Sequence, residues 1–76
     1  MKRLYSISKK ISDEDKQEIE KELNALDYVT VAEITEEGLI FDTADGDFTE
    51  AGNRAVNIFA RNGGAVISFQ RFIYDE

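Results

Sequence analysis

Apolar residues recur along the chain with two different periods. In residues 13–26, Ile19, Leu23 and Leu26 stand four and three residues apart, which is the spacing of one helical face. Residues 47–62 carry a second stripe of this kind: Phe48, Ala51, Ala55, Ile58 and Phe59. The sequence therefore predicts two helices, each with a single apolar side.

The rest of the pattern is β-branched, aromatic and roughly alternating, as is typical of strands. Four strands are predicted, over residues 3–8, 29–34, 39–43 and 65–74. Between the middle two strands, Gly38 can adopt the positive φ that a hairpin loop often needs. Asn62-Gly63-Gly64 can end the second helix in a left-handed cap.

The predicted order is β-α-β-β-α-β within one domain, residues 1–76. Two right-handed crossovers joined by a hairpin give a four-stranded antiparallel sheet with both helices on one face. We therefore expect an α+β, ferredoxin-like sandwich.

The start of the first helix is explained by local structure alone. Ser12 is placed to accept a hydrogen bond from a free backbone N–H at the helix start. Asp13, Glu14 and Asp15 follow it at the positive end of the helix dipole. We interpret this stretch as a helix cap.

The run from Ile19 to Leu26 (IEKELNAL), followed by Val29 and Val31, resembles the first helix and second strand of heavy-metal-associated domains. This family comprises the small copper chaperone modules. The resemblance implies the same ferredoxin-like fold. The family's Cys-x-x-Cys motif would fall at Ser12 and Asp15, and neither is a thiol, so no metal ligand is carried over.

Side chains for metal and catalytic chemistry are few. The chain has no cysteine and no histidine, so it lacks the usual zinc ligands, and Met1 carries its only sulfur for Cu(I). Its hydroxyl groups have no histidine to activate them. We expect no metal, no cofactor and no enzymatic activity.

An acid-rich turn follows the third strand. The acids Asp42, Asp45, Asp47 and Glu50 suggest a calcium loop, but Gly46 precedes the third acid instead of following it. We interpret the segment as a turn followed by a helix capped by Asp47, with Glu50 three residues on.

The net charge of −7 is unevenly distributed, because residues 11–50 hold fourteen of the sixteen acids. Such a surface repels nucleic acid and attracts a basic protein partner. On the first helix, like charges four residues apart cost a few tenths of a kcal/mol per pair. We predict an acidic partner-binding surface there: Asp13, Glu14, Asp15, Glu18 and Glu22.

The last strand offers a second surface. If Ile67, Phe69 and Ile73 face inward, strict alternation turns Val66, Phe72 and Tyr74 outward on the open sheet face. Exposed apolar patches of this kind mark contact sites, for a partner or for a homodimer through the sheet. Scattered outward aromatic residues are also ordinary, so both interpretations stay open.

No stretch has the length of a membrane span, and we expect a cytoplasmic protein without a membrane partner. The predicted function is that of a small acidic binding or regulatory protein acting through protein–protein contact. One sharper alternative is an accessory module related to metal-chaperone domains that has lost metal binding. The other is a stand-alone acidic inhibitor that imitates nucleic acid charge, of the phage anti-defence or anti-CRISPR type.

Overall fold

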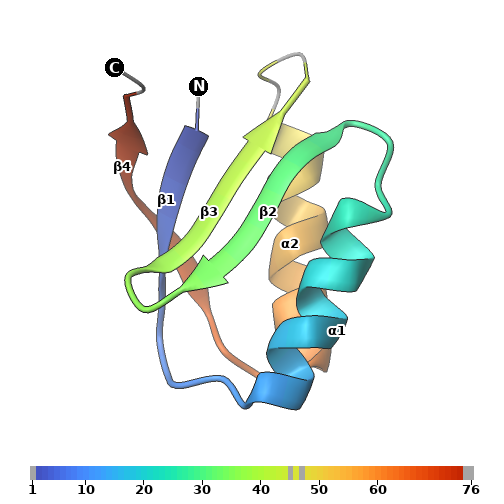
Figure 1. The fold of residues 1–76 in the computed structure, drawn as a ribbon, viewed down its shortest axis with the longest axis vertical. Helices are drawn as coiled ribbons and strands as arrows, with labels where there is room; N and C mark the ends of the chain where they lie inside the picture. Colours follow the sequence, from blue (N-terminus) through green and yellow to red (C-terminus); the bar gives the residue numbers. More distant parts are fainter. Residues whose placement is uncertain (1, 45, 47, 75–76) are drawn as a thin grey trace.

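The computed structural model describes residues 2–44, 46 and 48–74. Its elements in chain order are β1 (Lys2–Ile7), α1 (Asp13–Asn24), β2 (Val29–Thr35), β3 (Gly38–Thr43), α2 (Thr49–Arg61) and β4 (Ile67–Ile73). The strands form one antiparallel sheet in the order β2-β3-β1-β4, with the helices packed beside it (Figure 1). This arrangement confirms the predicted ferredoxin-like α+β fold.

The core lies between the helices and one face of the sheet. Ile19 and Leu23 of α1 are fully buried, which confirms the predicted stripe. They pack with apolar side chains of α2, the strands and the loops: Ile11, Ala32, Leu39, Phe41, Ala51, Ala55, Ile58, Phe59, Ala65 and Ile67. None of the helices described is long and apolar enough to cross a membrane.

The start of α1 and the end of α2 follow the predicted local chemistry. The Oγ of Ser12 accepts a hydrogen bond from the backbone N–H of Asp15 at 3.2 Å, so α1 has its cap. After α2, Gly63 and Gly64 adopt φ values of 103° and 72°, as a left-handed termination requires. α1 ends at Asn24, two residues before the predicted end.

The start of α2 differs from the prediction. The helix begins at Thr49, and its N-cap residue, Phe48, makes no side-chain hydrogen bond to the helix. The predicted cap, Asp47, lies outside the described residues.

The hairpin between β2 and β3 depends on a glycine. Gly38 has φ 140°, and a Cβ at this position would collide with the backbone carbonyl oxygen of Tyr5 on β1. The close approach of two backbones therefore requires a residue without a side chain.

The open face of the sheet has one buried apolar residue of its own. Leu4 is almost completely buried but is not part of the main core cluster. Its cross-strand neighbours are Ile40 on β3 and Arg71 on β4. Arg71 reaches Glu37 in the hairpin at 3.4 Å, so its side chain crosses β1 and helps to cover Leu4.

Candidate protein-binding surface

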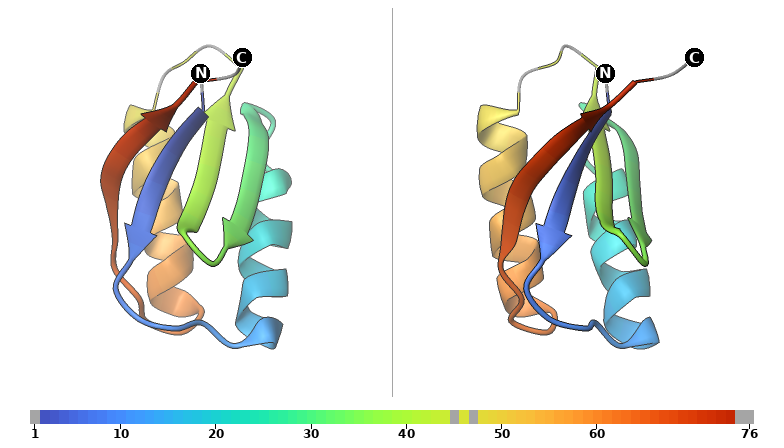
Figure 2. Two further views of the ribbon diagram at one scale, coloured as in Figure 1. Left: turned by 60° about the vertical axis from the view of Figure 1, so that its left-hand side comes forward. Right: turned by 90° about the vertical axis from the view of Figure 1, so that its left-hand side faces the viewer.

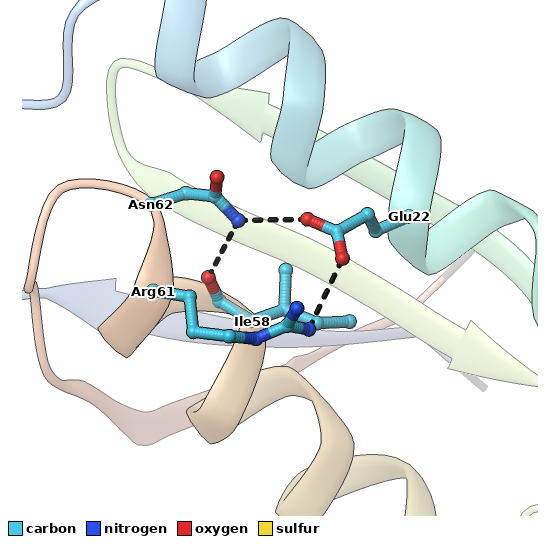
Figure 3. Close-up of polar contacts among 4 residues, drawn as sticks. All are labelled: Glu22, Ile58, Arg61 and Asn62. Atoms are coloured by element: carbon cyan, nitrogen blue, oxygen red, sulfur yellow. Dashed lines mark hydrogen bonds and ion pairs between the residues drawn. The ribbon is translucent and has the colours of Figure 1, made fainter.

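Glu22, predicted to belong to the acidic surface, is bound within the chain. Its Oε1 accepts a hydrogen bond from Nη2 of Arg61 at 3.1 Å, and its Oε2 accepts one from Nδ2 of Asn62 at 2.7 Å (Figure 3). The same Asn62 nitrogen donates to the carbonyl oxygen of Ile58 at 2.9 Å. Glu22 thus joins α1 to the C-terminal end of α2.

The other four acids of the predicted surface also differ in exposure. Asp15 is half-buried, and a Cβ on Gly63 would lie 3.3 Å from its Oδ2, so it packs against the end of α2. Asp13, Glu14 and Glu18 are exposed, with Asp13 3.9 Å from Nζ of Lys16. The accessible acidic face of α1 therefore consists of these three side chains.

α1 also covers one edge of the sheet. Glu20 accepts a hydrogen bond from the backbone N–H of Ile34 at 2.8 Å, and Nδ2 of Asn24 donates to the carbonyl oxygen of Ala32 at 3.1 Å. Both backbone groups belong to β2, which is an edge strand. Unpaired backbone groups on an edge strand can pair with another chain, and here two of them are occupied.

β4 forms the other edge, and no described residue covers it in this way. Within the part of the chain that the structure describes, the recorded hydrogen bonds of the Ile67–Ile73 backbone go to β1 alone. In Figure 2, β4 runs along the side of the molecule opposite α1. Alternate N–H and C=O groups of an edge strand point away from the sheet, so β4 presents them to an approaching chain.

A β-bulge changes which residues of β4 share a face. Tyr5 pairs with Phe69 but Leu4 pairs with Arg71, so Gln70 is the extra residue. Beyond the bulge, Phe72 and Tyr74 return to the face that carries Phe69. The prediction that these two residues face opposite to Phe69 is therefore wrong.

The ring contacts agree with this register. The ring centroids of Phe69 and Phe72 are 5.1 Å apart, and those of Phe72 and Tyr74 are 6.4 Å apart. Phe69 also contacts Tyr5, with 5.9 Å between the ring centroids, on the helix-bearing side of the sheet.

The predicted exposure of the three residues is confirmed, because Phe72 is 37%, Val66 64% and Tyr74 70% exposed. Val66 precedes Ile67, which belongs to the core, and so does not belong to this row of rings.

Arg3 lies among the same rings. Its guanidinium carbon is 3.9 Å from the ring centroid of Phe48, 5.0 Å from that of Phe72 and 5.5 Å from that of Phe69. Its Nε is buried and has no hydrogen-bond partner among the residues described. We call the outer edge of β4 together with Arg3, Phe69, Phe72 and Tyr74 the β4 surface.

α2 adds an apolar side chain on the same side of the molecule. Successive helical residues are about 100° apart, so Val56 lies on the flank of α2 turned away from Arg61 and α1. Val56 is exposed, as are Phe69, Phe72 and Tyr74 of the β4 surface. Phe69 and Phe72, two of the large exposed apolar side chains, belong to β4 itself, and Val66 and Tyr74 flank it in the sequence.

Two depressions lie elsewhere on the molecule. One, of about 510 Å³, is bordered by Lys9, Lys10 and Lys16 together with acids of the hairpin. The other, of about 630 Å³, lies between the helices beside Leu26 and Ile58. No group of three or more potential ligands that could hold a metal occurs among residues 2–44, 46 and 48–74.

Comparison of the chain with family models, curated proteins and solved structures finds no match. The resemblance to heavy-metal-associated domains therefore stays a prediction. The candidate site rests on the geometry of the β4 surface alone.

Proposed function

We propose that this protein is a non-enzymatic binding module that takes up an extended segment of a partner protein along β4. The observation that carries the proposal is the difference between the two edges of the sheet. Side chains of α1 occupy backbone groups of β2, whereas none of the described residues bonds to the outer edge of β4, which is bordered by exposed aromatic rings.

Strand addition suits this geometry. A segment that pairs with an edge strand gains main-chain hydrogen bonds, and its alternate side chains contact the adjoining face. On β4 that face carries Phe69 and Phe72, whose rings touch each other. Aromatic side chains provide large apolar contact areas at binding sites.

The acidic face of α1 has less to support it as the contact surface. Glu22 is engaged by Arg61 and Asn62, and Asp15 is half-buried. The three remaining exposed acids are accounted for by solvation, which is the ordinary role of charge on a helix surface. An inhibitor that imitates nucleic acid would depend on these three.

Peptides displayed on phage provide the probe for a direct test. We expect selected peptides to shift the backbone amide resonances of Phe69–Ile73 in NMR titrations. Phe72→Ala should weaken their binding about tenfold or more, as loss of a buried aromatic contact does.

Val66→Ala is the matched control, because Val66 is also exposed but does not belong to the row of rings. It should leave the affinity unchanged. Peptides that instead shift the amides of α1 and bind Phe72→Ala normally would show that β4 is not the binding surface.

A further inference from the structure

We infer that the segment added to β4 is acidic and that one of its carboxylates binds Arg3. This inference rests on the proposed function, because it names the partner of the same surface. Its basis is the guanidinium of Arg3, which the fold holds in place and which has no anionic partner among the residues described.

Arg3 is positioned by rings, and its buried Nε has no acceptor among the described residues. Phe48, Phe69 and Phe72 attract the guanidinium through their π faces, but an aromatic ring has no lone pair to accept its N–H groups. A guanidinium has five N–H donors. A buried donor that is left without an acceptor costs free energy. None of the ion pairs between described residues involves Arg3.

A carboxylate is the acceptor that fits this group. Its two oxygens match the planar guanidinium, and hydrogen bonds between ionised groups are roughly twice as strong as neutral ones. The rings limit the rotation of Arg3, so little further side-chain entropy is lost on binding. The carboxylate would therefore add to the main-chain hydrogen bonds of the paired segment.

The charges at this edge of the sheet favour the same partner. β1 and β4 contain Lys2, Arg3 and Arg71 and no acidic residue, in a chain with a net charge of −7. Arg71 is paired with Glu37 of the hairpin, so Arg3 is the cation that lies among the rings of β4. Asp75 and Glu76, which follow in the sequence, lie outside the described residues. An acidic segment is thus attracted to the β1–β4 edge and repelled by α1.

A second copy of this chain fits β4 less well. Symmetric pairing of two β4 strands would bring the bulge at Gln70 against the bulge of the other copy. Bulges and charges on an edge strand are the usual means of preventing such pairing. A flexible segment can adapt its backbone to the bulged strand. The occupant we infer is therefore a segment of another protein.

Three synthetic peptides of about the length of β4 test the charge preference. Each alternates valine with one polar residue, which is glutamate, glutamine or lysine. In NMR titrations at low salt we expect the glutamate peptide to shift the Phe69–Ile73 amides. It should bind about tenfold more tightly than the glutamine peptide, as expected for one charge-assisted hydrogen bond.

Variants of Arg3 test whether this residue causes the preference for the glutamate peptide over the glutamine peptide. Arg3→Gln should reduce the difference between the glutamate and glutamine peptides to less than about twofold, because the charge-assisted bond is lost. Arg3→Lys should retain part of it. Arg54→Gln is the matched control, because it removes an exposed cation that pairs with Glu50 on α2, and it should keep the full difference.

Each alternative outcome has a separate meaning. Equal binding of the glutamate and glutamine peptides at β4 would overturn the acidic partner and leave the proposed function intact. If no peptide shifts the β4 amides at millimolar concentration, both are overturned. Concentration-dependent shifts of the same amides without peptide, with a dimer mass in sedimentation, would identify a second copy as the occupant.

Discussion

At the scale of single residues, Gly38 is the glycine at which an added side chain would meet the closest obstacle. Its φ of 140° is unfavourable for any other residue, and a Cβ would meet the Tyr5 carbonyl oxygen. We expect Gly38→Ala to lower the free energy of unfolding by about 2 kcal/mol or more, because backbone strain and a collision with backbone combine. Urea denaturation measures the change.

Gly52 provides the control for this prediction. It lies inside α2, and a Cβ there would meet no atom within 4 Å beyond its chain neighbours and the backbone of its own helix. Gly52→Ala should raise the free energy of unfolding by about 0.5–1 kcal/mol, since alanine loses less backbone entropy in a helix. Tolerance of alanine at position 38 would mean that the hairpin does not approach β1 as closely as the structure has it.

At the scale of elements, Glu22 links the two helices. Glu22→Ala removes the acceptor of Arg61 and Asn62 from a side chain that is only 27% exposed. We expect a loss of about 1 kcal/mol in the free energy of unfolding, the typical net value of such contacts. Glu18→Ala, which removes an exposed acid from the same helix, should change it by less than about 0.5 kcal/mol. Equal effects would contradict the link.

The elements themselves could be predicted because each buries one side of a regular structure. Ile19 and Leu23 are spaced for a helix and are fully buried. Ser12 caps that helix through a hydrogen bond to Asp15, which is only three residues away in the sequence. Local patterns carry information of this kind directly.

The candidate site could be predicted only in part. Phe72 and Tyr74 are exposed as expected, but alternation placed them on the wrong face because a single extra residue, Gln70, exchanges the faces beyond it. The partners of Glu22 lie 39 and 40 residues away, and Arg3 meets Phe48 only through the fold. Contacts between distant segments leave no periodic signal in the sequence.

At the scale of the whole molecule, charge is separated across the sheet. The exposed acids Asp13, Glu14 and Glu18 belong to α1, which covers the β2 edge, whereas Arg3 belongs to β1, the strand next to the β4 edge. Such a separation orients a charged partner before contact, and salt weakens the effect. An acidic segment would approach with α1 turned away from it.

This asymmetry predicts the sign of a long-range effect. Replacing Asp13, Glu14 and Glu18 with their amides removes repulsion without touching the β4 surface. We expect the variant to bind the valine–glutamate peptide about twofold more tightly at low salt, with the gain lost at 0.5 M salt because charges are then screened. Its folding stability should stay within about 0.5 kcal/mol, because relief of the Glu14–Glu18 repulsion offsets the lost charges at the helix start.

The opposite result would identify a different contact surface. If the exposed acids of α1 bind the partner, the wild-type protein should take up the valine–lysine peptide with shifts at the amides of Glu14 and Glu18. The triple variant should then lose that binding, whereas Phe72→Ala should retain it. Because the α1 acids and β4 lie at opposite edges of the sheet, the two sets of shifted amides do not overlap. A titration of the three proteins with both charged peptides therefore assigns the contact to one edge of the sheet or the other.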